Sequence, residues 1–320
     1  MDRRSFFRSM GCVGALVSTS QLPVFAQDDA TVFPQRGGYE RLTLGYAVIE
    51  IGLETPFSVL HISDTHLTAA YPEEDEKKQE LHRVRTTTFG GRQEEALRDS
   101  LAWAKEHVDY VIHTGDLIDW QSEANFALVK QYFGEAMTGS LGNHEYSTDM
   151  WLSDPKESRD EAYKANTKER VQKAYPFDVQ FHSQVVHGVN FITLDDVYGY
   201  VTPAQVERFH EEVKRGLPII LCMHVPFISE NIWRATCKFW KSGKNRFREK
   251  EVPQPTDDYL TQLEDPVTRV FIAYLKQEPL LKGILAGHEH FTMQDRFSPT
   301  AIQYIVGSNF LFHGQEILFL

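Results

Sequence analysis

Five short clusters of metal-binding residue types are spread along this chain, and each follows a predicted strand. The clusters are Asp64-Thr65-His66, Gly115-Asp116-Leu117-Ile118-Asp119, Gly142-Asn143-His144-Glu145, His224, and Gly287-His288-Glu289-His290. Apolar runs at 59–62, 110–112, 219–221 and 284–286 precede four of them. Such runs, bounded by glycine or polar turns, are typical of buried strands. Because open α/β folds bind their ligands where strands end, we expect the five clusters to form one site.

The rest of the pattern predicts an α/β fold in which mixed sheets pack on each other with helices outside. Predicted strands and helices alternate in the first half of the chain, and His187-Gly188 indicates a hairpin in the second. Helices are predicted at 93–107, from Ser122 to about 136, after a capping box at Thr202, and at 266–276. Strands are predicted at 42–50, 57–62, 179–186, 189–194, 301–306 and 316–320.

We expect residues 42–320 to form one domain with three insertions. Residues 68–91, 147–176 and 227–262 do not fit the alternation, and each directly follows a metal-binding cluster. Segments placed in this way are expected over or beside the site, where they select the substrate. For 227–262 the alternative is a solvated lid whose aromatic side chains pack into a small core of their own.

The net charge of the chain argues against polyanionic partners. The chain has 320 residues, with 45 acidic against 33 basic side chains and a formal net charge of −12. A field of this sign repels nucleic acid and anionic lipid surfaces, so we expect no nucleic-acid binding. Bound divalent cations would still attract a single phosphate group.

Residues 1–26 have the pattern of an export signal. The basic start at 3–8 precedes a mostly apolar stretch and a small-residue cleavage site at 24–26. Arg3-Arg4 followed by Phe6-Phe7 is similar to a twin-arginine signal, and an ordinary secretory signal with a chance arginine pair is the alternative. We therefore expect recognition by export machinery, a periplasmic or extracellular protein, and a mobile leader at 27–41. No later apolar stretch approaches the ~20 residues that a membrane span needs.

The cysteines do not predict a disulfide-rich scaffold. Two cysteines, Cys222 and Cys237, lie after the predicted signal and would allow one disulfide. Cys222 belongs to a predicted buried strand, so we interpret it as a small apolar residue instead.

The spacing within the clusters favours metal binding by oxygen and nitrogen atoms. Asp64 and His66 are two residues apart, as are His288 and His290, so each pair presents its side chains to one face of an extended strand end. Carboxylate and imidazole ligands suit Mn, Fe, Zn or Ni, and the lack of thiolates argues against a closed structural zinc site. Phosphoryl hydrolysis favours two cations about 3.5–4 Å apart. Such a pair needs a bridging carboxylate, for which Asp116 is the candidate.

The clusters resemble those of the calcineurin-like metallophosphoesterases, and the resemblance extends from Asp64 to His290. It implies a four-layer α/β/β/α sandwich and a dinuclear metal centre. It also implies that a hydroxide bridging the metals attacks the phosphorus in line. The implied ligands of the first metal are Asp64, His66, His290 and Asp116, and those of the second are Asn143, His224, His288 and Asp116.

The same resemblance implies two catalytic residues, and the chain departs from the family at two points. His144 would stabilise the scissile group or protonate the leaving oxygen, and Asp119 would orient His144. Protein phosphatases of this superfamily have Arg-Gly where this chain has Trp120-Gln121, so their phosphate clamp is missing. Purple acid phosphatases have tyrosine at the position of Asp119. Candidates for a replacement clamp, on position alone, are His82, Arg83 and Arg85, or the basic residues of 234–248.

Four further residues have structural interpretations. His61 and His113 lie inside strands, and we expect hydrogen-bonded core residues rather than ligands. Glu145 and Glu289 either support the neighbouring ligands or lie in solvent.

The sequence therefore predicts an exported, metal-dependent phosphoesterase that acts on a phosphomonoester or a phosphodiester. One alternative is a diesterase or pyrophosphohydrolase acting on nucleotide-like or lipid-headgroup substrates. A second is a binding module that retains metals without catalysis. The complete set of ligand positions, together with His144, argues against the second.

Overall fold

The computed structural model describes four stretches of the chain. The predicted export signal at 1–26 and the leader, except Arg41, lie outside the described residues, so both stay predictions. The described residues are 41–133, 137–148, 161–240 and 255–320.

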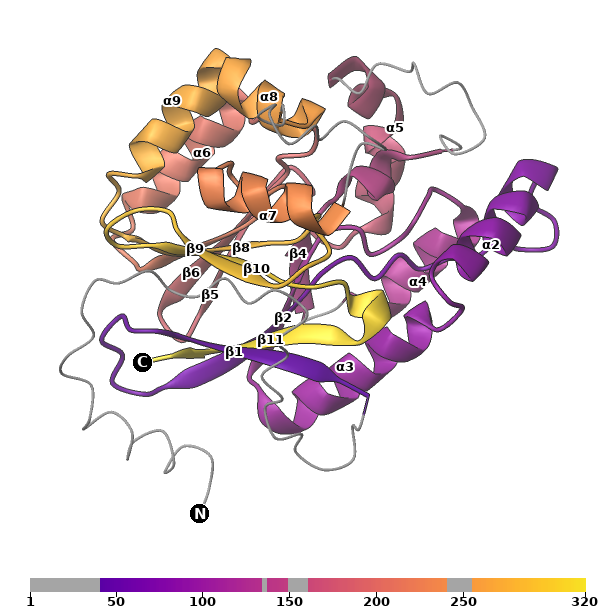
Figure 1. Ribbon diagram of the computed structural model, residues 1–320, viewed down its shortest axis with the longest axis horizontal. Helices are drawn as coiled ribbons and strands as arrows, with labels where there is room; N and C mark the ends of the chain where they lie inside the picture. The colour runs from indigo at the N-terminus through magenta and orange to yellow at the C-terminus, as the bar shows by residue number, and fades with distance from the viewer. Residues whose placement is uncertain (1–40, 134–136, 149–160, 241–254) are drawn as a thin grey trace.

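Two mixed sheets form the centre of the molecule, as predicted (Figure 1). The first has the order β1 (Thr43–Ile49), β11 (His313–Phe319), β2 (Phe57–Ile62), β3 (Tyr110–Thr114), β4 (Met137–Ser140). The second has the order β5 (Phe181–Val186), β6 (Val189–Leu194), β7 (Ile219–Cys222), β8 (Leu281–Ala286), β10 (Ile302–Ile305), β9 (Met293–Arg296). Strands β2, β3 and β4 are parallel, as are β6, β7 and β8. The five clusters follow β2, β3, β4, β7 and β8, so all leave carboxyl ends of parallel strands.

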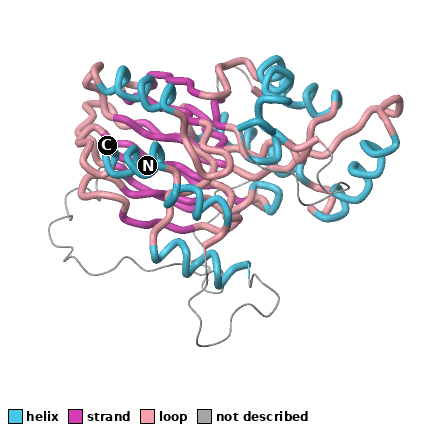
Figure 2. Tube along the Cα trace, turned by 90° about the horizontal axis from the view of Figure 1, so that it is seen from above, coloured by secondary structure: helices cyan, strands magenta, loops and turns pink. Residues whose placement is uncertain are grey.

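Helices cover the outer face of each sheet and complete the four-layer sandwich (Figures 1 and 2). Side chains of α3, α4 and α5 pack on the first sheet, and those of α6 and α9 pack on the second. The helices are α2 (Glu76–Thr88), α3 (Gln93–His107), α4 (Glu123–Tyr132), α5 (Glu161–Ala174), α6 (Pro203–Val213), α7 (Glu230–Trp240), α8 (Asp257–Glu264) and α9 (Pro266–Leu275), with short 3-10 helices η1 (Asn143–Tyr146) and η2 (Asn309–Leu311).

Strand β2 shows why the central strands have unbroken apolar runs. All of its residues are buried, because the strand lies between the two cores. Phe57 and Val59 point into the core between the sheets, whereas Leu60 and Ile62 point to the core under α3 and α4. Burial on both faces replaces the usual alternation of apolar and polar residues.

Local signals place several elements as predicted. Helix α3 has the predicted bounds, and Ser122 caps α4 by accepting a hydrogen bond from the backbone N–H of Asn125 at 3.0 Å. Thr202 forms the predicted capping box with Gln205. The β5–β6 hairpin turns through His187 and Gly188, both left-handed, with φ of 49° and 83°.

The three insertions contain helices. Segment 68–91 contains α2, segment 147–176 contains α5, and segment 227–262 contains α7 and α8. Among the described residues, no helix is long and apolar enough to cross a membrane. Cys222 and Cys237 are both free thiols, so they do not form the disulfide that the sequence would allow.

Candidate metal centre

The backbone is left-handed at five of the predicted metal ligands. Positive φ angles of 51–68° occur at Asp64, His66, Asp116, His288 and His290. Both residues of the pairs Asp64/His66 and His288/His290 are therefore left-handed, so neither pair lies on the extended strand end that the spacing suggested. This conformation costs a non-glycine residue about 1–3 kcal/mol and persists only where surrounding contacts impose it.

Backbone hydrogen bonds between the first two cluster loops impose part of this conformation. The N–H of Asp64 donates to the carbonyl of Gly115 at 3.0 Å, and the N–H of His66 donates to Asp116 at 2.9 Å. Leu67 continues the pairing to Leu117 at 2.8 Å. The loops after β2 and β3 thus extend the pairing of their strands and hold both carboxylates in place.

Glycines in the clusters allow the loops to approach each other closely. A Cβ atom on Gly142 would lie 2.1 Å from Asp116 Oδ1, and one on Gly287 would lie 1.8 Å from Ser63 Oγ. Real Cβ atoms essentially never make contacts this short. Any larger residue would push these loops apart.

Asp64, His66 and His290 form one group of possible metal ligands. Their donor atoms all lie within 4.8 Å of one another. His290 Nε2 is 3.2 Å from Asp64 Oδ1, and His66 Nε2 is 3.3 Å from His290 Nε2. The structure therefore brings together the residues predicted for the first metal.

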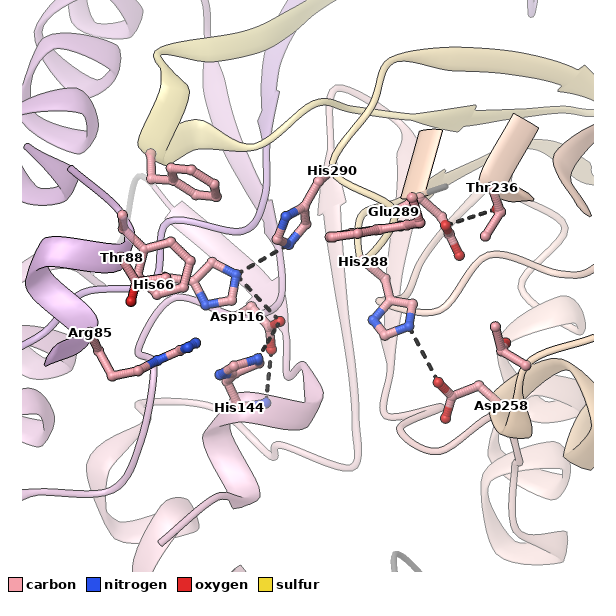
Figure 3. Close-up of a pocket in the computed structure, with 14 residues that line it drawn as sticks. His66, Arg85, Thr88, Asp116, His144, Thr236, Asp258, His288, Glu289 and His290 are labelled. Carbon is pink, nitrogen blue, oxygen red and sulfur yellow. Dashed lines mark hydrogen bonds and ion pairs between the residues drawn. The ribbon is translucent and has the colours of Figure 1, made fainter. Parts of the chain in front are cut away.

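Asp116 lies between this group and the residues predicted for a second metal (Figure 3). Its Oδ2 is 3.7 Å from His66 Nε2 and 3.3 Å from His224 Nε2. His288 Nδ1 in turn lies 3.2 Å from His224 Nε2. Asp64 also lies near the second predicted metal site, because its donor atom is within 4.8 Å of those of Asp116 and His224.

The donor set fits metal binding. Within the described part of the chain, Asp64 Oδ1 and Asn143 Oδ1 are buried oxygens without a well-formed hydrogen bond, and His290 Nε2 lies 3.2 Å from the former. Unsatisfied buried acceptors are costly. Both oxygens belong to residues predicted as ligands. Carboxylate, amide and imidazole groups together suit divalent first-row metals.

Electrostatics favour ionised carboxylates at the centre. Burial alone would raise the pKa of Asp64 and Asp116, but neighbouring histidines outweigh it and hold both pKa values below the usual range. Burial, together with His144, lowers the pKa of His66. Ionised carboxylates and a neutral imidazole are the forms that bind metals.

Asp119 joins the metal ligands to the predicted acid. Its Oδ1 lies 3.0 Å from His66 Nδ1 and 2.8 Å from His144 Nδ1. Arg85 donates to the same carboxylate from Nε at 2.6 Å and from Nη2 at 3.0 Å. The donor atoms of His66, Asp119 and His144 also lie within 4.8 Å of one another. Their direct contacts account for this arrangement without a third metal ion.

His144 lies between the carboxylates of Asp116 and Asp119. Burial would lower its pKa, but the carboxylates of Asp116 and Asp119 outweigh burial and raise it to about 9. Because Asp119 accepts the Nδ1 proton, Nε2 points to the centre, 3.9 Å from Asp116 Oδ2. Asp119 and His144 are therefore in contact, and the catalytic roles assigned to them stay predictions.

Glu145 is a buried support and does not lie in solvent. Its carboxylate accepts the backbone N–H groups of Asp116 at 3.0 Å, Leu117 at 2.7 Å and Gly142 at 2.7 Å, and the hydroxyl of Tyr175 at 3.0 Å. Burial and the charge of Asp116 raise its pKa to about 7. The same carboxylate therefore fixes the loops after β3 and β4.

Asp196, which no sequence motif marked, supports the ligand loop after β7. Its Oδ1 accepts the backbone N–H groups of His224 at 3.0 Å and Val225 at 3.2 Å. Burial raises its pKa to about 7. The available signal was its place two residues beyond β6, at the edge where the clusters lie.

Glu289 joins the last cluster to the third insertion. It is buried and accepts hydrogen bonds from Thr236 Oγ1 at 2.8 Å and from the Tyr259 hydroxyl at 2.5 Å. The side chains come from α7 and α8. Like Glu145, it supports its cluster from inside the protein.

His61 and His113 are core residues, as predicted. Their Nε2 atoms lie 2.9 Å from the hydroxyls of Thr114 and Thr65, respectively. Burial lowers the pKa of each to about 3, so both rings are neutral.

A cavity of about 530 Å³ opens over these ligands (Figure 3). Arg85, Thr88 and His66 lie on one side of it, and Thr236 and Asp258 lie on the other. Its other described lining residues are Phe89, Asp116, His144, Trp240, Thr256, His288, Glu289, His290 and Phe310.

Two of the three insertions line the cavity directly. Segment 68–91 contributes the wall that contains Arg85, and segment 227–262 contributes the opposite wall. Aromatic side chains of the described part of the latter segment also pack with Phe291, and its role in substrate selection stays a prediction. The described part of segment 147–176 does not line the cavity, and it supports the site through Tyr175 instead.

The candidates for a phosphate clamp lie in different places. Arg85 lines the cavity and pairs with Asp119. Arg83 is 71% exposed and pairs with Glu80 at 2.6 Å, and His82 is not among the described lining residues. Of the basic segment, residues 241–248 lie outside the described residues.

The sequence profile of calcineurin-like phosphoesterases matches residues 57–291, and the chain belongs to this family of phosphoester hydrolases. Among curated proteins, none is similar enough in sequence to match.

Solved structures with similar folds include a dimetal phosphatase from Danio rerio, with 13% identity over 79% of this chain and 88% of that chain and a TM-score of 0.43. A 5'-nucleotidase from Candida albicans is 14% identical over 84% of this chain and 48% of that one, with a TM-score of 0.40. The calcineurin-like phosphoesterase YfkN from Bacillus subtilis is 9% identical over 80% and 82%, with a TM-score of 0.41.

Proposed function

We propose that the protein is a phosphoester hydrolase that works with two metal ions. Asp64, His66 and His290 would hold one ion, and Asp116 would contribute its carboxylate to both. Asn143, His224 and His288 would complete the site of the second ion. The observation that carries this proposal is the position of Asp116 Oδ2, which lies 3.7 Å from His66 Nε2 and 3.3 Å from His224 Nε2. When bound, two cations supply positive charge to the attacking and leaving oxygens of an in-line displacement.

His144 completes the reaction from the protein side. With its Nδ1–H donated to Asp119, the ring directs Nε2 into the cavity, and the Asp119 carboxylate favours the protonated form of the ring. A protonated imidazole at this position donates its Nε2 proton to the oxygen of the leaving group. Asp119 keeps the ring in the required orientation.

A specific observation favours a phosphodiester over a phosphomonoester. Among the described lining residues, Arg85 is the one arginine or lysine, and its guanidinium binds Asp119. A diester carries one negative charge and needs less compensation than a monoester dianion. Phe89 with Phe310 on one side, and Trp240 on the opposite wall, offer apolar surfaces to the organic part of such an ester.

Hydrolysis of matched nitrophenyl phosphate monoesters and diesters by the full chain tests this proposal. We expect Mn²⁺-activated turnover that a chelator abolishes and that Asp116→Asn loses, with the diester hydrolysed faster. Full turnover by metal-free Asp116→Asn protein would contradict the dinuclear mechanism. Tight binding of a phosphate ester without turnover would instead support a binding module.

We also propose export through the twin-arginine route, on the support of residues 3–7 alone. A protein exported while folded would acquire its metals in the cytoplasm, before it meets competing ions outside. Changing both Arg3 and Arg4 to lysine is expected to retain the protein in the cytoplasm, as fractionation would show. Normal export of this variant would contradict the route.

A further inference from the structure

One carboxylate of the third insertion contacts a predicted metal ligand. Asp258, in the first turn of α8, places Oδ2 at 3.3 Å from His288 Nε2. Both side chains are mostly buried, with 20% and 23% of their surfaces exposed. Figure 3 shows the Asp258 carboxylate facing the His288 ring. The contact joins the third insertion to the cluster after β8.

The other nitrogen of the same ring faces the proposed second metal. His288 Nδ1 lies 3.2 Å from His224 Nε2, which itself lies 3.3 Å from Asp116 Oδ2. A neutral imidazole carries its proton on one nitrogen and a lone pair on the other. A carboxylate that accepts the Nε2 proton therefore leaves the Nδ1 lone pair directed at the centre.

Hydrogen bonds join α8 to the loop after β8 and to the loop after β7. Tyr259, the next residue, donates to Glu289 at 2.5 Å, and Thr236 of α7 donates to the same carboxylate at 2.8 Å. Gln262 donates to the carbonyl of Pro226 at 3.0 Å and accepts the N–H of Ile228 at 2.8 Å. The insertion is therefore bound to both ligand loops of the second sheet.

A glycine sets the distance of α8 from the site. Gly199 has a φ of +79°, and a Cβ atom there would lie 2.0 Å from the backbone oxygen of Asp258. The start of α8 thus packs directly on the loop after β6. Only a residue without a side chain allows the Asp258 backbone to lie this close.

We propose that Asp258 is a positioning residue for the second metal. It accepts the Nε2–H of His288 and so presents Nδ1 as the ligand atom. This inference rests on the proposed function, because it requires a metal at the centre. It makes the third insertion part of the metal site, although none of the five clusters includes it.

Metal binding by the full-length protein tests the inference without reference to turnover. The metal-free wild type, Asp258→Ala and Asp257→Ala proteins would each be titrated with Co²⁺ against a competing chelator, with the absorption spectrum recorded. Asp257 is the matched control, because it lies in the same first turn but is exposed.

We expect the wild type to bind two ions and Asp258→Ala to bind one of them about 10–100-fold more weakly. The tighter ion should be unaffected, and Asp257→Ala should behave as the wild type. Equal affinities for both ions in Asp258→Ala and wild type would overturn the inference. Failure of the wild type to bind any ion would instead overturn the proposed function.

A second measurement needs no substitution and so does not depend on how Asp258→Ala folds. In the Zn²⁺-loaded wild type, ¹H–¹⁵N correlation spectra of the histidine rings report which nitrogen carries the proton. We expect His288 to carry it on Nε2 with Nδ1 bound to the metal. A proton on Nδ1 would overturn the inference.

Discussion

The two sides of the metal centre hold their histidines with carboxylates of different kinds. On the first-sheet side, Asp119 is fully buried and contacts His66, His144 and Arg85. On the other side, Asp258 retains 20% exposure and contacts His288.

The difference shows two ways to position a ligand. Asp119 stands three residues after Asp116, in the loop that supplies the proposed bridging carboxylate, so one loop supplies both groups. Asp258 arrives on a helix of an insertion, which must be fastened to the site by further hydrogen bonds. We therefore expect substitutions on the Asp119 side to lower turnover or the free energy of unfolding more than substitutions on the Asp258 side.

The largest expected effect is on turnover, from the residue that Asp119 orients. His144→Ala should lower kcat by about 10²–10⁴-fold because the leaving oxygen loses its proton donor. Both metals should remain bound, as metal analysis would show. His210→Ala, at an exposed position, is the control. Unchanged kcat in His144→Ala would remove this residue from the mechanism.

Removal of each carboxylate compares the two sides directly. Asp119→Ala leaves Arg85, which is 13% exposed, without its buried partner and should lower the free energy of unfolding by roughly 3–5 kcal/mol. Asp258→Ala should lower it by only about 0–1 kcal/mol, because its ion pair is partly solvated. Urea denaturation of the metal-free proteins measures both. Equal losses would show that the two sides are not distinct.

The two buried glutamates of the clusters sharpen the comparison. Both carboxylate oxygens of Glu145 accept rigid backbone N–H groups. In Glu145→Gln the side-chain NH₂ would face one of these N–H donors, so the free energy of unfolding should fall by about 1–3 kcal/mol. Glu289 faces the hydroxyls of Thr236 and Tyr259, which can rotate to become acceptors. Glu289→Gln should therefore cost less than Glu145→Gln in the same denaturation assay.

The smallest effect is expected from a single hydroxyl on the insertion side. Tyr259→Phe removes one hydrogen bond to Glu289 and should lower the free energy of unfolding by about 0.5–1.5 kcal/mol. Because Asp258 precedes Tyr259, the same variant should also slightly lower the affinity for one of the two ions in the Co²⁺ titration. A loss of more than 3 kcal/mol would show that α8 is as rigidly built as the Asp119 side.

Most of the fold could be predicted because its signals are local. The capping box at Thr202, the turn at His187-Gly188 and the spacing of 93–107 each act within a few residues, and each is found where it was predicted. The buried strands were equally visible, since β2 and β3 lie inside and must be apolar on both faces. Because each cluster follows the end of a strand, the sequence also predicted that the five clusters meet at one edge of the sheets.

The supporting residues could not be predicted, because nothing in their local sequence marks them. Asp196 and Asp258 resemble many other aspartates, and Glu145 was equally compatible with solvent. Their roles depend on backbone N–H groups and ring nitrogens that come from other loops. The left-handed ligands were also missed, because spacing alone suggested extended strand ends.

The sequence by itself thus determined which chemistry the centre offers and which sheet edge carries it, since residue types and strand ends are properties of short segments. Tertiary structure decided how each ligand is aimed, through Asp119 on one side and Asp258 on the other. The physical reason is that a hydrogen bond to a ring nitrogen requires placement within a few tenths of an ångström. The packing of α8 against Gly199 and of the β2 and β3 loops against each other contributes to that precision.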